Sequence, residues 1–114
     1  MKGISTHILD LVLGKPAEGM PLRLEKQGTT GDWRLLTSGR ADQDGRCAQL
    51  LPDGENLSPG VYRLIFDTAS YYALQKVDVL YPVVEVMFQA RAGDSHFHIP
   101  LLLSPNGYTT YRGS

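Results

Sequence analysis

This sequence has one cysteine, almost no net charge and no long apolar run, and each absence excludes a class of protein. Cys47 stands alone among 114 residues, so no disulfide can form within the chain, and we expect a cytoplasmic setting. The net charge is only −1, which argues against partners such as nucleic acid or an anionic membrane surface. No stretch is apolar enough to cross a bilayer or to resemble a secretory leader.

The length predicts a single domain, residues 1–114. A fold of this size buries roughly two-thirds of its unfolded surface, so it needs no metal or disulfide for stability. We find no internal repeat, linker or low-complexity tract.

Short segments of alternating apolar and polar residues dominate the chain, separated by Gly, Pro, Asp and Asn. Such alternation is typical of β-strands with one buried face. Eight segments fit this pattern: 4–12, 22–27, 33–38, 46–51, 61–68, 83–90, 95–103 and 108–112. They predict an all-β sandwich. Residues 69–77 break the alternation and predict one short helix, with Thr68 or Ser70 as its N-cap.

The end of the chain concentrates side chains that can do chemistry. In segment 95–103 alternation assigns one apolar face to the core, made of Phe97, Ile99, Leu101 and Leu103. His96 and His98 therefore point the other way. If the final hairpin pairs Leu103 with Tyr108, His98 lies opposite Gly113 and shares its face with Tyr111.

Two residues far from this hairpin extend the same chemistry. Ile4 and Ile8 suit the core, which turns His7 outward, and Arg46 follows the Asp44-Gly45 turn at a sheet rim. A histidine with a pKa near ~6.5 can take a proton from water. An arginine can donate two hydrogen bonds to carbonyl or enolate oxygens. Together these groups indicate a hydrolytic site for a small anionic or amide-rich ring.

Each of these residues also has a purely structural interpretation. His7 fits an exposed side chain without a role, Arg46 a solvated charge, and His96 a structural or exposed position at a strand start. Cys47 fits a small buried residue better than a reactive thiol. The two histidines of 95–103 have no further ligand at suitable spacing, so we expect no metal site.

Five motifs, spread over nearly the whole chain, match the pattern of a known family. They are ISTHILD at 4–10, GKPA at 14–17, DGR at 44–46, HFHIPLLLSP at 96–105 and GYTTYRGS at 107–114. Together they resemble the transthyretin-related proteins, and more narrowly the 5-hydroxyisourate hydrolases of purine breakdown. The closing Tyr-Arg-Gly-Ser is the most specific motif, since hormone-carrying transthyretins lack it. Asn106 and Thr109 depart mildly from the family pattern.

The resemblance implies a transthyretin-like (prealbumin-like) sandwich of two four-stranded sheets with one short helix. It also implies a homotetramer with sites at the interface between dimers, and no cofactor. His7, Arg46 and His98 are the implied catalytic residues. The implied substrate-binding residues are Tyr111, Arg112, Gly113 and Ser114.

The expected reaction is hydrolysis of 5-hydroxyisourate to 2-oxo-4-hydroxy-4-carboxy-5-ureidoimidazoline in urate degradation. One of the two histidines, His7 or His98, would deprotonate the attacking water, and Arg46 would stabilise the developing oxyanion. The main alternative is a transthyretin-like carrier that binds a small aromatic ligand without turnover. An immunoglobulin-like adhesion domain is a third alternative, but it predicts a leader or a cysteine pair.

Overall fold

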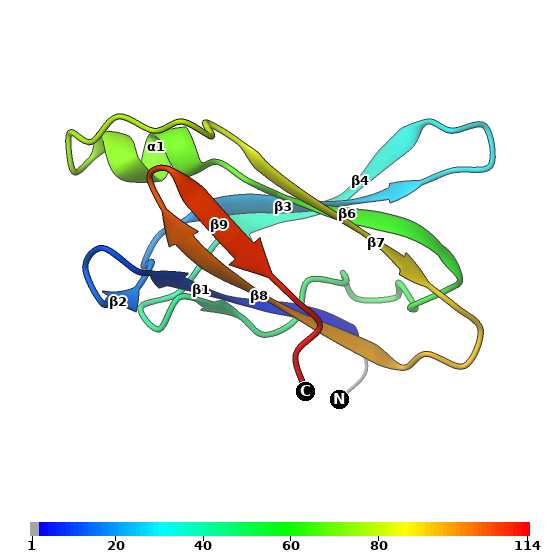
Figure 1. Ribbon diagram of the computed structural model, residues 1–114. Coiled ribbons are helices and arrows are strands. Elements are labelled where there is room, and N and C mark those ends of the chain that lie inside the picture. Colours follow the sequence, from blue (N-terminus) through cyan, green and yellow to red (C-terminus); the bar gives the residue numbers. More distant parts are fainter. Residues whose placement is uncertain (1–2) are drawn as a thin grey trace.

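The computed structural model describes residues 3–114, which form two β-sheets packed face to face with a short helix at one end (Figure 1). The elements in chain order are β1 (Gly3–Asp10), β2 (Lys15–Pro16), β3 (Pro21–Gln27), β4 (Trp33–Arg40), β5 (Arg46–Cys47), β6 (Gly60–Phe66), α1 (Thr68–Ala73), β7 (Val84–Ala90), β8 (His96–Ser104) and β9 (Gly107–Thr110). The predicted all-β sandwich with one short helix is confirmed.

The two sheets differ in how their strands are joined. One sheet has the order β4-β3-β6-β7 and is antiparallel throughout. The other has the order β2-β1-β8-β9, with β5 also pairing with β1. In this second sheet β1 and β8 run parallel, so the first strand of the chain lies beside its penultimate strand. The two-residue strand β2, where the sequence predicts no strand, makes this sheet five-stranded rather than the expected four.

The core lies between the sheets and follows the predicted alternation. The apolar face of β8 is buried as expected, and it meets side chains of β1, β3 and β6. The buried core residues of these four strands include Ile4, Ile8, Leu22, Leu24, Tyr62, Leu64, Phe66, Phe97, Ile99, Leu101 and Leu103. Because alternate residues fill the core, the residues between them are turned to the outer faces.

Asp10 ends β1 two residues before the predicted end at Val12. Its buried carboxylate accepts hydrogen bonds from the backbone N–H groups of Val12 and Leu13. The same carboxylate accepts a hydrogen bond of 2.8 Å from the Tyr71 hydroxyl of α1. These bonds turn the chain out of the sheet and connect β1 to the helix.

The helix is shorter than the predicted 69–77, and neither predicted residue is its N-cap. The cap is Asp67, whose carboxylate accepts a hydrogen bond from the Ser70 backbone N–H. Thr68 is buried within the first turn and donates its hydroxyl to the carbonyl of Tyr81. The helix has six residues, and residues 3–114 contain no helix that is long and apolar enough to span a membrane.

The predicted strand 46–51 is also too long, since β5 covers only its first two residues. The edge of β1 is shared here, because β5 pairs with Thr6 and His7 while β2 pairs with the end of β1. After Cys47 the chain leaves the ladder, although the Leu50 backbone N–H still donates to the carbonyl of Ile4. The alternation in 46–51 therefore reflects burial of Leu50 against the core rather than continuous strand pairing.

Candidate active site

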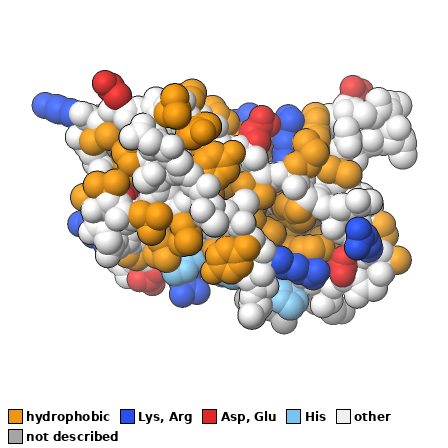
Figure 2. Space-filling model, viewed as in Figure 1, with side chains coloured by type: hydrophobic (Ala, Val, Ile, Leu, Met, Phe, Trp, Pro, Cys, Tyr) orange, Lys and Arg blue, Asp and Glu red, His pale blue; other side chains and the backbone are white. Residues whose placement is uncertain are grey.

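The parallel pairing of β1 with β8 brings the two candidate histidines to one face. Its register sets Ser5 beside His98 and His7 beside Pro100. Directly paired residues share a face of a sheet, so His7 and His98 both project from the outer face. Figure 2 shows histidine side chains next to arginine or lysine side chains along the lower part of the molecule, where Figure 1 shows this sheet.

A tight turn before β5 delivers Arg46 to the same face. The Asp42 carboxylate accepts hydrogen bonds from the backbone N–H groups of Asp44 and Arg46, at 2.8 and 2.9 Å. Gly45 has φ 73°, and a Cβ there would lie 2.4 Å from the carbonyl oxygen of Ile8. Only glycine permits this approach, and it lets Arg46 pair directly with His7.

The terminal segment reaches the site through the predicted hairpin register. Leu103 pairs with Tyr108, which is the register assumed from the sequence. The register continues beyond β9, because the Gly113 backbone N–H donates to the carbonyl of His98 at 2.7 Å. This contact sets Ser114 beside the outer face of β8.

A pocket of about 280 Å³ lies where these segments meet. It is lined by Ser5, Thr6, Arg46, Cys47, Ala48, His96, His98 and Ser114. Three predicted site residues thus share one cavity, and His7 pairs with one of them, Arg46. The imidazoles and the guanidinium that lie far apart in sequence are gathered on one surface.

The positive charges around His98 favour its neutral form. Burial lowers the pKa of its imidazole, and the charges of His7, Arg46 and His96 lower it further. A histidine whose pKa lies below the ordinary value of about 6.5 is unprotonated at neutral pH. His98 therefore has a lone pair available to accept a proton.

The remaining predicted residues are less closely engaged with the pocket. Tyr111 is 55% exposed. Arg112 is directed elsewhere, since its guanidinium lies 4.3 Å from the centre of the Phe97 ring and donates to the carbonyl of His96. It also lies 3.9 Å from the Asp94 carboxylate. None of these contacts points toward a ligand.

Two residues that line the pocket, Ser5 and His96, were not among the predicted site residues. Ser5 Oγ and His98 Nδ1 form a hydrogen bond of 2.8 Å. The signal was available, because Ser5 stands two residues before His7 and must share its face in a strand. The partner of Ser5 could not be found without the register of β1 against β8.

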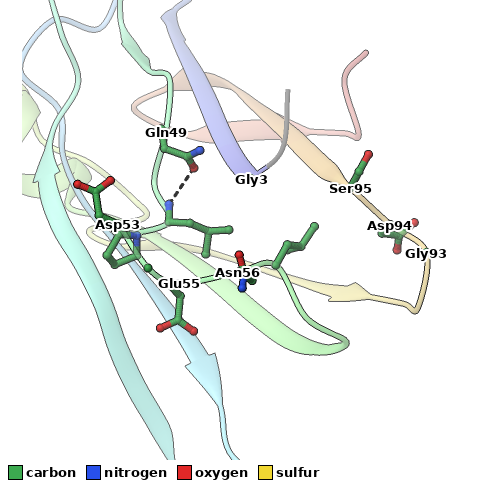
Figure 3. A pocket seen from close by; sticks show the side chains of 12 residues that line it. Gly3, Gln49, Asp53, Glu55, Asn56, Gly93, Asp94 and Ser95 are labelled. Carbon is green, nitrogen blue, oxygen red and sulfur yellow. Dashed lines mark hydrogen bonds between the residues drawn. The ribbon is translucent and has the colours of Figure 1, made fainter.

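A second, larger cavity is lined by acidic side chains rather than by histidine and arginine. It encloses about 530 Å³ between the loop that follows β5 and the turn between β7 and β8. Figure 3 shows Asp53, Glu55 and Asp94 around it, together with Gln49, whose side-chain oxygen accepts from the Leu51 backbone N–H. It holds carboxylates but no imidazole or guanidinium. Across residues 3–114, no three His, Cys, Asp or Glu side chains are grouped to hold a metal ion.

Comparisons with known proteins agree with the motifs. The model of the HIUase/Transthyretin family matches residues 4–113. The 5-hydroxyisourate hydrolase of Salmonella dublin is 45% identical over 97% of this chain and 80% of its own length.

Solved structures give the same family. The Klebsiella pneumoniae 5-hydroxyisourate hydrolase is 33% identical, with a TM-score of 0.85 and full coverage of both chains. The transthyretin of Sparus aurata is also 33% identical, with a TM-score of 0.91 over 99% of this chain and 97% of its own. The chain belongs to the HIUase/Transthyretin family.

Proposed function

We propose that this protein hydrolyses 5-hydroxyisourate to 2-oxo-4-hydroxy-4-carboxy-5-ureidoimidazoline, a step of urate degradation. The observation that carries the proposal is the shared pocket of Arg46 and His98, with His7 paired to Arg46. The 5-hydroxyisourate hydrolases similar to this chain along nearly all of its length support the same reaction.

The proposed step is attack of water on a ring carbonyl of the substrate. A histidine takes a proton from the water as its oxygen bonds to the carbonyl carbon. The ring C–N bond then breaks, and the leaving nitrogen takes a proton. The lowered pKa of His98 supports this role, because a neutral imidazole can accept the proton at pH 7.

Arg46 stabilises the negative charge that develops on the carbonyl oxygen. A guanidinium donates two hydrogen bonds in one plane, which fits the adjacent carbonyls of a purine-derived ring. Ser114 contributes a hydroxyl to the same pocket, and Tyr111 covers the substrate from the outer face. Arg112 and Gly113 hold the terminal segment in place through their contacts with His96 and His98. This chemistry requires no cofactor.

The reaction can be followed by absorbance. Urate is oxidised in situ to generate 5-hydroxyisourate, and its decay is compared with and without the purified protein. We expect a large acceleration by the wild type and a loss of most of it in His98→Asn. A decay rate equal to the spontaneous rate with folded wild-type protein would contradict the proposal.

A carrier without turnover is the alternative function, and the likeness to Sparus aurata transthyretin favours it. The two functions differ in what the pocket must contain. Binding of an apolar aromatic ligand has no need of two imidazoles and a guanidinium together. Ligand binding without acceleration of 5-hydroxyisourate decay would support the carrier.

We also propose that the protein is a homotetramer with sites at the interface between dimers. The support is a set of exposed apolar side chains at one end of the five-stranded sheet. Leu11, Val12 and Leu13 are 48–64% exposed, and Tyr108 is 41% exposed. The backbone N–H of Leu11 donates to the carbonyl of Leu103, which pairs with Tyr108, so both groups lie at the same end of this sheet. A second copy that covers them removes apolar surface from water.

Light scattering tests the assembly directly. A tetramer has four times the 12.6 kDa of one chain. Val12→Asp adds a charge at an exposed position. The substitution should leave the fold of one chain intact and weaken the interface, because the carboxylate would be buried there. We expect a smaller assembly with reduced hydrolysis, whereas a wild-type monomer with full activity would contradict this proposal.

A further inference from the structure

The His98 ring is fixed on two sides by residues that take no part in the steps above. The 2.8 Å hydrogen bond of Ser5 occupies Nδ1. On the other edge the backbone of Gly113 lies so close that a Cβ there would be 2.7 Å from Cδ2. The ring therefore has one nitrogen, Nε2, left for the pocket that it lines.

The other candidate base is not held in this way. In the described part of the chain the His7 imidazole makes no hydrogen bond. Ser5, in contrast, is only 7% exposed and is set beside His98 by the strand register itself. A base with a fixed orientation is already aligned when the substrate binds, whereas a mobile ring must first be ordered.

We propose that Ser5 is a positioning residue that accepts a hydrogen bond from Nδ1–H of His98, so that Nε2 is unprotonated and His98, rather than His7, is the general base. This inference rests on the proposed hydrolase function. It assigns separate roles to two imidazoles that the sequence leaves equivalent.

The properties of a serine hydroxyl favour this direction of the bond. The nitrogen that carries the proton in a neutral imidazole is set by the bond that the other nitrogen makes. As an acceptor, Ser5 Oγ can keep the Nδ1–H bond both before and after Nε2 takes a proton. If Ser5 donated instead, the proton would sit on Nε2, and the ring could not act as a base toward the pocket.

A neutral partner also keeps the base at a useful pKa. A carboxylate at the position of Ser5 would stabilise the imidazolium and raise its pKa. The groups that face His98 are His7 on β1, Arg46 on β5 and His96 on β8, and all of them lower it. Ser5 orients the ring without opposing that effect.

Nitrogen-15 NMR of the wild type tests the tautomer without any substitution. We expect the His98 proton on Nδ1 at pH 7.5 or above. A proton on Nε2 would overturn the proposal, whether or not the protein is active.

Kinetics of three variants test the consequence. Ser5→Ala removes the acceptor, and we expect kcat to fall about 10- to 100-fold with KM within about twofold. Ser5→Thr keeps the hydroxyl and should restore most of kcat. Ser104→Ala is the matched control, because Ser104 is on β8, the strand of His98, but donates to the carbonyl of Gly107 and does not line the pocket.

The outcomes are distinguishable from failure of the proposed function. If the wild type hydrolyses 5-hydroxyisourate and folded Ser5→Ala keeps its full kcat, the role of Ser5 is refuted and the hydrolase stands. If the wild type itself is inactive, the hydrolase proposal fails, and the NMR result still decides the tautomer. Thermal unfolding of each variant separates a lost hydrogen bond from a lost fold.

Discussion

The outer faces of the two sheets both carry arginine, but they differ in whether acidic side chains pair with its charge. On the four-stranded sheet Arg63 donates to Glu25, contacts Glu85 and stacks over Trp33 at 4.1 Å. Glu25 also accepts from Arg23. On the five-stranded sheet Arg46 makes no ion pair within residues 3–114 and lies among imidazoles.

The difference indicates which face is built for a ligand. On the Glu25 face burial raises the pKa of the carboxyl, but the bonds and charges of Arg23 and Arg63 outweigh it and keep the pKa low. On the Arg46 face burial lowers the pKa of His98, and the charges of His7, Arg46 and His96 lower it further. A cluster of like charges is unfavourable for stability, and an incoming anion or developing oxyanion compensates for it.

Substitution of Arg46 should have the largest effect on activity. Arg46→Met removes the group that stabilises the oxyanion, and we expect kcat/KM to fall about 100- to 1,000-fold. Because the guanidinium has no ion-pair partner in the described chain, the unfolding midpoint in urea should hardly change. A variant that loses stability but keeps kcat/KM would reverse our assignment of the two faces.

Gly113→Ala should have the next largest effect on activity. The new methyl group would push the His98 ring, and we expect kcat to fall about tenfold or more, as for other small displacements of a reacting group. The matched control is Gly107→Ala in the same hairpin, where the nearest atom to a new Cβ is 3.9 Å away. Equal activity in both alanine variants would show that the ring is not confined as described.

Arg63→Met tests the opposite face. It leaves Glu25, whose side chain is 11% exposed, with Arg23 alone. We expect a loss of about 1–2 kcal/mol in the free energy of unfolding, between the values for exposed and buried ion pairs. Hydrolysis at neutral pH should be unchanged, and a parallel loss of kcat would mean that the two faces are coupled.

The pH dependence provides the smallest but most specific test. The pKa of His98 is lowered on folding, so folding favours its neutral form. Well above pH 6.5 the His98 imidazole therefore leaves the free energy of unfolding unchanged. As the pH falls below 6.5, it lowers that free energy, because the unfolded chain binds the proton more readily. The acid limb of kcat/KM should lie below pH 6.5. In Arg46→Met one positive neighbour is gone, so the His98 pKa measured by NMR should rise; a fall would contradict the charge assignment.

The sequence predicted the local parts of this site and not its long-range contacts. Alternation placed His98 outward because the core face of β8 is uniformly apolar, and the structure confirms the register assumed for the final hairpin, Leu103 with Tyr108. The sequence could not show that Ser5 meets His98, because that contact depends on a parallel register between distant strands.

The errors arose where tertiary contacts override local patterns. The helix begins at Asp67 because its carboxylate caps the first turn, while Thr68 is buried against the carbonyl of Tyr81. The strand after Arg46 is short because β1 shares its edge between two partners. Alternation alone cannot reveal how many strands compete for one edge.

The parallel pairing of β1 with β8 has a consequence for how the protein is made. Ser5 and His98 are 93 positions apart, so β1 emerges from the ribosome long before the strand that it must join. Until β8 follows, one edge of β1 has its amide and carbonyl groups unpaired, a state prone to sticking to other chains. Closing so large a loop slows folding. The pocket is therefore among the last parts of the molecule to form, and catalytic competence reports on completion of the whole domain.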